Sequence, residues 1–248
     1  MREQTSNEME NQNKFINSRL LIGLGLVLAA LIGAYTFYQV RSFDNTLTVT
    51  GSTSKEVTSD HVRWVGSISR IVKLDTLKTG YADMARDTAD VQTFLKEKNI
   101  PSDQIIISAV SMDQNYDQAQ GEPRTYTLRQ TIEVNSSDVD GITQIAKNIN
   151  PLIEKGVIFS TQSLEYTYTK LPEERVAMLS DAIKDAKARA ASLAEASGKS
   201  VGQLKSASSG VVQVMSAGST DVSDYGMYDT SKIEKSIMMT VKASFTLK

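Results

Sequence analysis

The strongest constraint in this sequence is an uninterrupted apolar run near its N-terminus. The run from Leu20 to Val40 contains no charged side chain, and Arg19 and Arg41 bound it. As an α-helix with a rise of 1.5 Å per residue, the run would extend about 31 Å, which matches the hydrocarbon thickness of a bilayer. It has no polar face, so burial as a helix of a soluble domain is the weaker interpretation. We therefore predict one transmembrane helix.

A cleaved signal peptide is the main alternative for this run. The segment before it is long and carries Glu3, Glu8 and Glu10, and no small-x-small cleavage site follows, so this alternative is disfavoured. Lys14 and Arg19 on the N-terminal side favour a cytoplasmic N-terminus. The sequence then divides into a short cytoplasmic tail (1–19), a transmembrane anchor (20–40), a linker (41–45) and an extracytoplasmic domain (46–248).

Composition excludes several classes of function. The chain has 27 Lys and Arg against 29 Asp and Glu, no cysteine and one histidine. The near balance of charge disfavours nucleic acid as a partner. Without cysteine there is no disulfide scaffold, thiolate metal site or cysteine nucleophile. Common nucleotide-binding, serine-hydrolase and zinc-protease motifs are also missing. We expect no catalytic, cofactor-binding or metal-binding residues and no cofactor, so the chain is not expected to be an enzyme.

The predicted domain opens with two antiparallel β-ribbons. Residues 46–57 are rich in β-branched side chains and residues 61–73 alternate apolar and polar positions, so we pair them as the first ribbon. Residues 105–112 and 126–134 flank a polar tip and form the second. Strands are also predicted at 157–169, 204–216 and 233–247, and the last alternates strictly between apolar and polar residues.

Helical periodicity appears three times in the same region. Residues 75–99 form a long amphipathic helix that ends before Pro101, and a short helix at 139–148 begins after Ser137 or Asp138 as N-cap. A second long helix opens at Pro172 and ends near Ser197, with Gly198 as C-cap. The predicted core stripe of that helix is Val176, Leu179, Ile183, Ala186, Ala190 and Leu193. The order predicts one α+β unit, with antiparallel ribbons and sheet packed against two long helices and one short helix.

Several side chains have the chemistry of a site but a simpler interpretation. His61 lies on the polar face of its strand, which favours a surface residue over a catalytic or metal-binding one. Asp221, Asp224 and Asp229 could gather Ca²⁺, but their spacing does not match an EF-hand and favours a solvated loop. The methionines near the C-terminus would form an oxidant sink only if a stress role holds. They are Met227, Met238 and Met239.

The chain resembles the SIMPL-domain (DUF541) family of extracytoplasmic bacterial proteins, over about residues 47–248. The resemblance rests on TVTGSTSKEV, NIPSDQIIIS, TYTLRQTIEV, the alanine-rich DAIKDAKARAASLAEASGKSVGQL and the terminal TVKASFTLK. It implies a SIMPL-like α+β fold and a place among periplasmic immunogenic and oxidative-stress defence proteins. The predicted anchor departs from the family, since many relatives resemble secreted periplasmic proteins. Together, the anchor and the resemblance predict a single-pass protein of the bacterial inner (cytoplasmic) membrane, with its C-terminal domain in the periplasm or outside the cell.

Two functions of different class follow from these observations. The first is a membrane-anchored, non-enzymatic module that forms a homo-oligomer, partly because the resemblance implies large ring or channel assemblies in some members, and that supports envelope or oxidative-stress tolerance. The second is an extracytoplasmic protein that binds a small molecule, a peptide or another envelope protein. Its candidate residues are the tyrosines of two strands, Tyr126, Tyr166 and Tyr168, for which ordinary sheet packing is the simpler interpretation.

Overall fold

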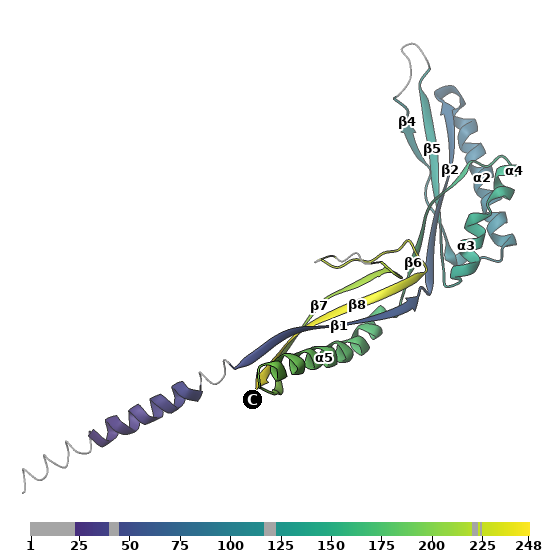
Figure 1. The fold of residues 1–248 in the computed structure, drawn as a ribbon. Coiled ribbons are helices and arrows are strands. Elements are labelled where there is room, and N and C mark those ends of the chain that lie inside the picture. The colour runs from purple at the N-terminus through teal and green to yellow at the C-terminus, as the bar shows by residue number, and fades with distance from the viewer. Residues whose placement is uncertain (1–22, 40–44, 117–122, 220–222, 224) are drawn as a thin grey trace, which may run out of the picture. The chain divides into compact units, whose positions relative to one another are not determined.

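The computed structural model describes residues 23–39, 45–116, 123–219, 223 and 225–248 (Figure 1). Residues 23–39 form a helix in which every residue is exposed. Residues 20–22 and 40 of the predicted anchor lie outside the described residues. Within the described ranges, the structure contains no helix whose length and hydropathy reach what a membrane span requires.

The remainder is an α+β fold with two sheets, as the sequence predicts. It divides into two compact units. Unit 1 comprises the described residues before Ser52, together with Ile183–Ser208 and Lys242–Lys248. Unit 2 comprises Ser52–Ala182 and Ser209–Val241.

The larger sheet lies entirely within unit 2 and has five strands. Its order is β3 (Ile105–Ile107), β5 (Thr125–Ser136), β2 (His61–Lys73) and β6 (Phe159–Thr167), with β4 (Ser111–Gln114) also pairing β5. All of these pairs are antiparallel. The predicted second ribbon is therefore confirmed, although its first strand is split into β3 and β4.

Helices cover one face of this sheet (Figure 1). They are α2 (Leu77–Glu97), α3 (Val139–Lys147) and the short α4 (Asn150–Glu154), which the sequence analysis missed. The alternation of β2 places Trp64 and Ile68 on the covered face, where they join the hydrophobic core with Met84 and Leu95 of α2. Tyr81, which also follows the apolar spacing of α2, is 41% exposed. The carboxylate of Asp138 caps α3 by accepting a hydrogen bond from the Gly141 N–H at 2.9 Å, as predicted.

The smaller sheet has three strands in the order β1 (Thr46–Thr58), β8 (Glu234–Leu247) and β7 (Val201–Ser216). The predicted first ribbon is therefore wrong, because β1 pairs with β8 and not with β2. Both predicted strands exist, but proximity along the chain did not decide their partners. In β8, every second residue from Ile237 to Phe245 is buried, which confirms its predicted alternation.

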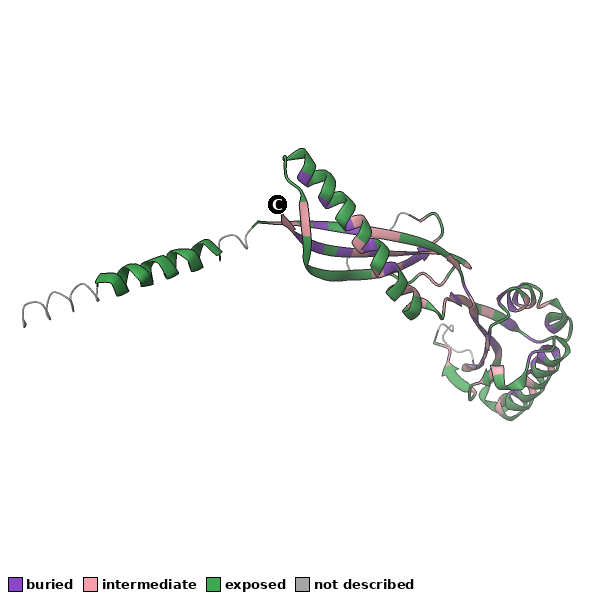
Figure 2. Ribbon diagram, turned by 90° about the horizontal axis from the view of Figure 1, so that it is seen from below, coloured by how far each residue is buried: buried purple, intermediate pink, exposed green. Residues whose placement is uncertain are grey.

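Helix α5 (Leu171–Ala196) carries a buried stripe that matches the predicted one only at Ala186 and Ala190. Val176 is 74% exposed and Leu193 is 55% exposed, so neither belongs to the core. The buried residues of α5 recur every four positions. Figure 2 marks them as purple bands along the helix. They are Met178, Ala182, Ala186, Ala190 and Ala194. Small side chains allow a helix backbone to approach its neighbours closely. The structure therefore buries the alanine side of α5 and leaves larger apolar residues such as Val176 exposed.

Candidate functional site

The structure separates the tyrosines that the binding hypothesis grouped. The Tyr166 hydroxyl is buried and lies 3.0 Å from the Thr143 Oγ1 of α3. The Tyr168 hydroxyl instead lies 3.4 Å from Glu174 Oε1. Burial and the Glu174 carboxylate raise the pKa of Tyr168. These two residues therefore have structural contacts of their own, whereas Tyr126 borders an open cavity at the end of the sheet.

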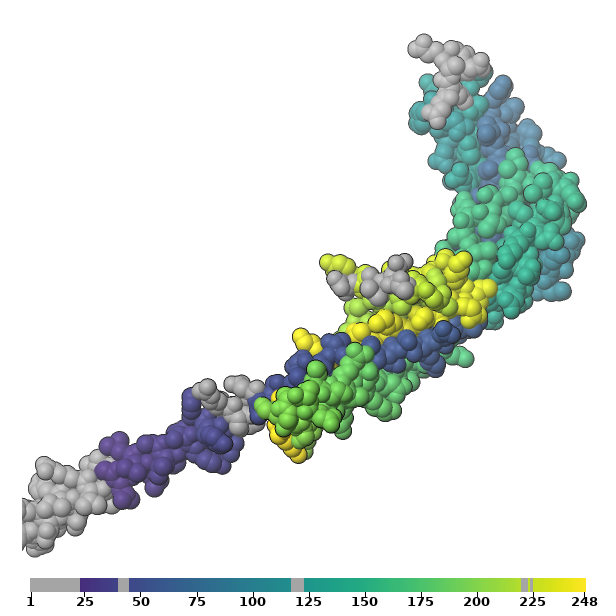
Figure 3. Space-filling view, viewed as in Figure 1, coloured from purple at the N-terminus to yellow at the C-terminus, as the bar shows by residue number. Residues whose placement is uncertain are grey.

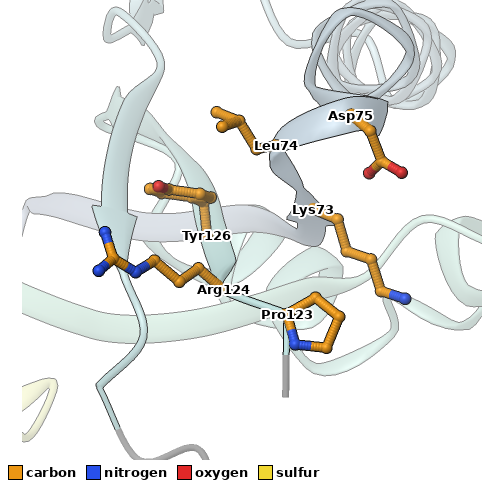
Figure 4. A pocket seen from close by; sticks show the side chains of 6 residues that line it. All are labelled: Lys73, Leu74, Asp75, Pro123, Arg124 and Tyr126. Carbon is orange, nitrogen blue, oxygen red and sulfur yellow. The ribbon is translucent and has the colours of Figure 1, made fainter. Parts of the chain in front are cut away.

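That cavity, of about 570 Å³, lies where β2 ends and β5 begins. Its lining residues include Lys73, Leu74, Arg124 and Tyr126, and Figure 4 shows the Lys73 and Arg124 side chains extending to opposite sides. Two cations that diverge do not converge on one anion, so the cavity lacks the charge clamp of an anion site. The Tyr126 ring remains available for an apolar or planar contact.

The predicted acidic loop is only partly described, since Asp221 and Asp224 lie outside the described residues. The Asp229 carboxylate accepts hydrogen bonds from the Ser216 hydroxyl and from the Ser231 N–H, the latter at 2.7 Å. The Ser216 and Ser231 hydrogen bonds lower the pKa of Asp229 to about 2. In the part of the chain that the structure describes, no three acidic or histidine side chains gather as metal ligands would.

A charge cluster on the five-stranded sheet was missed by the sequence analysis. The guanidinium of Arg63 lies between two carboxylates: it pairs with Glu133, and its Nη1 is 3.1 Å from Glu165 Oε2. Hydrogen bonds from Arg63 and Asn135 lower the pKa of Glu133. The Glu133 carboxylate is then not suited to donate a proton near neutral pH. The cluster joins β2, β5 and β6 electrostatically. His61, for which the sequence favours a surface position, lies on the same strand as Arg63 and is partly buried.

Lys235 of β8 is a second unpredicted feature, because its side chain is fully buried. Its ammonium donates hydrogen bonds to the carbonyl oxygens of Asp229 at 2.5 Å and Lys232 at 2.8 Å. It also lies 5.7 Å from the centre of the Tyr228 ring. Burial lowers the pKa of Lys235, against the attraction of the Asp229 carboxylate. These contacts hold the segment that precedes β8 against its first residues.

An open apolar surface of unit 2 lies between the start of α5 and the second half of β7. A groove of about 480 Å³ is lined by Val176 and Leu179 of α5, by Val211 of β7 and by Tyr225. Val176 is 74% exposed, Val211 is 43% exposed and Tyr225 is 96% exposed. Figure 3 shows that part of the outer side of α5 lies at the molecular surface. The α5–β7 groove is therefore an apolar strip that solvent reaches.

An edge strand forms one wall of the α5–β7 groove. β7 pairs with β8 on one side only. On its other side, only Val214 makes backbone hydrogen bonds among the described residues. Its N–H donates to the Met227 carbonyl oxygen and its carbonyl oxygen accepts from the Asp229 N–H, both at 2.8 Å. Gly210 permits tight pairing with β8, since a Cβ there would lie 2.3 Å from Thr240 Oγ1. Unpaired edges of this kind are sites where a further strand can add.

The comparisons place this fold in a known family. The family model SIMPL, described as "Protein of unknown function (DUF541)", matches residues 47–246, which is most of the chain. No curated protein matches the sequence significantly. The resemblance stated from the sequence is therefore confirmed over nearly the same residues.

Proposed function

Since this chain belongs to the SIMPL (DUF541) family, whose function is unknown, we propose from its own surfaces that it is a membrane-anchored extracytoplasmic module that associates with copies of itself. The proposal adds no chemical reaction. It places the protein in the bacterial inner membrane, with the domain after residue 45 in the periplasm or outside the cell, where it supports envelope or stress tolerance. The uncharged run from Leu20 to Val40 supports the anchor.

The observation that carries self-association is the α5–β7 groove beside an edge strand. Val176, Val211 and Tyr225 leave apolar area in water that a partner would cover, and burying such area is favourable by about 25 cal/mol per Å². The neighbouring strand edge offers backbone hydrogen bonds to the same partner. A second copy of the chain would cover this apolar area and pair with this strand edge, and no other protein is required.

Light scattering after size-exclusion chromatography of the full chain in detergent tests this proposal. We expect one discrete oligomer whose mass falls in the Val211→Lys variant, because a charge in the groove must be desolvated on association. Ile153→Lys is the matched control, since Ile153 is 55% exposed on α4 and away from the groove. A wild-type chain that stays monomeric in detergent and in lipid nanodiscs at high protein concentration would overturn self-association.

Ligand binding is the second candidate, and the exposed cavity beside Tyr126 favours it. A planar or apolar small molecule would stack on the tyrosine ring. Screening a metabolite panel for shifts in melting temperature tests this candidate, because a ligand that binds only the folded state stabilises it. A shift that Tyr126→Ala removes would support it, and no shift across the panel would reject it.

A further inference from the structure

Positive charge is concentrated in unit 1. Its segments Ile183–Ser208 and Lys242–Lys248 carry seven lysine and arginine residues against two acidic ones. A chain that ends at Lys248 adds one carboxylate, which still leaves an excess of positive charge. Unit 2 has the opposite balance, with 16 basic residues against 23 acidic ones. The overall charge of −2 therefore conceals two parts of opposite sign.

Part of this charge lies where the domain begins. The Lys199 ammonium donates a hydrogen bond to the Asn45 Oδ1 at 3.4 Å, and Asn45 is the first described residue after the helix at residues 23–39. The backbone N–H of Leu247 donates a hydrogen bond to the backbone carbonyl oxygen of Asn45, and the N–H of Lys248 donates one to the carbonyl oxygen of Ser200. Lys199 and Lys248 thus lie beside the start of the domain, and both are exposed.

The covalent chain limits how far this end can lie from the helix at residues 23–39. Six Cα–Cα steps join Gln39 to Asn45, and a fully extended chain covers about 20 Å over that length. If residues 20–40 span a bilayer, the start of the domain is held within the reach of lipid headgroups. The lysines around Asn45 can then reach the headgroup phosphates.

We propose that the Lys199–Lys248 end of unit 1 docks onto the anionic surface of the membrane that holds the anchor, an inference that rests on the proposed anchoring. Headgroup phosphates complement the lysines, whereas the acidic balance of unit 2 gains nothing from such a surface. Docking would restrict the motion of the domain on its short linker and limit the orientations in which its α5–β7 groove can meet a second copy.

The test uses the full chain in nanodiscs of two compositions, phosphatidylcholine alone and a three-to-two mixture of phosphatidylcholine and anionic phosphatidylglycerol. Amide hydrogen exchange is followed in peptides covering residues 197–206 and 242–248. We expect slower exchange in the anionic discs only, and a return to the neutral-disc rate at about 0.5 M salt, where screening extends only a few Å. Equal exchange in both kinds of disc would overturn the proposal.

Charge variants assign the effect to this end of the domain. A lysine near an anionic surface contributes about fivefold to binding, so Lys199→Gln with Lys248→Gln should lower the ratio of docked to undocked protein about 30-fold. Lys78→Gln with Lys170→Gln is the control, since it removes the same charge from exposed positions of unit 2. Equal losses of protection in the two variants would overturn the assignment.

Flotation with vesicles separates this proposal from the proposed anchor. A full chain that floats with pure phosphatidylcholine vesicles supports the anchor independently of charge. A chain that does not float with them overturns the anchor, and vesicles of the same three-to-two anionic mixture then test docking alone. Salt-sensitive flotation that the Lys199→Gln, Lys248→Gln variant loses would support a lipid-binding surface, and no flotation would reject it.

Discussion

Gly66 of β2 provides the sharpest test of the packing described above. A Cβ built on this residue would lie 2.1 Å from Cζ of Phe159 and 2.8 Å from its Cε1. The Phe159 ring is buried and packs edge-on against Trp64, with ring centres 5.7 Å apart. Carbon atoms need about 3.5 to 4 Å, so the ring would have to move by about 1.5 Å within a packed core. Gly66→Ala therefore overpacks the five-stranded sheet.

The expected cost follows from two opposing contributions. Forcing a methyl group into a packed core costs about 1 to 3 kcal/mol. Replacing glycine by alanine also stiffens the unfolded chain, which returns about 0.4 to 1 kcal/mol. We expect Gly66→Ala to lower the free energy of unfolding by about 1 to 2 kcal/mol. Phe159→Leu shortens the obstructing side chain, so the two changes together should cost at least about 1 kcal/mol less than their sum.

Urea unfolding followed by tryptophan fluorescence measures this free energy directly, because Trp64 is the only tryptophan of the chain. Ser69→Ala, on the same strand, is the control for substitution without overpacking. A Gly66→Ala variant within about 0.5 kcal/mol of wild type, the range of neutral surface substitutions, would refute the reasoning. Strict additivity with Phe159→Leu would refute it as well, since the two side chains would then not compete for the same space.

Three further substitutions test individual contacts of the described residues. Asp87 is buried and receives two hydrogen bonds from Arg70, at 2.5 and 2.7 Å, so Asp87→Asn should cost about 3 kcal/mol in urea unfolding, and a loss under about 1 kcal/mol would contradict this. The pKa of Asp229 is lowered to about 2, so its stabilisation is present above about pH 4 and is lost as pH falls through about 2. Asp229→Asn should therefore flatten the dependence of stability on pH in that range, and an unchanged slope would oppose the prediction. Asp138→Ala removes the cap of α3 and should cost about 1 kcal/mol, most of which Asp138→Ser should recover, and an uncapped variant as stable as wild type would count against it.

Local patterns predicted the elements of this fold better than their partners. The strict alternation of residues 237–245 identified β8, and Asp138 and Gly198 were recognised at helix ends because capping depends on nearby residues. Pairing of β1 with β8 joins the two ends of the domain sequence, and no local signal specifies it. The sequence therefore predicted an α+β fold with antiparallel pairing but assigned β1 to the wrong sheet.

The candidate groove was missed for a related reason. On α5, Val176 and Leu193 follow helical spacing as well as the alanines do, so the predicted core included these larger side chains beside Ala186 and Ala190. The structure buries the smaller ones, which turns the misassigned Val176 into a wall of the groove. Likewise, Arg63 joins Glu133 and Glu165 only through strand register, which periodicity within one strand does not reveal.

The burial of Lys235 makes this residue a reporter of motion in the segment before β8. Acylating reagents react with neutral amines that solvent reaches, and the Lys235 ammonium is enclosed by the carbonyl oxygens of Asp229 and Lys232. Exposed lysines such as Lys78 would be modified at once, whereas Lys235 would react only when this segment separates from β8. The rate of its acylation, followed by peptide mass, therefore measures how often that local opening occurs.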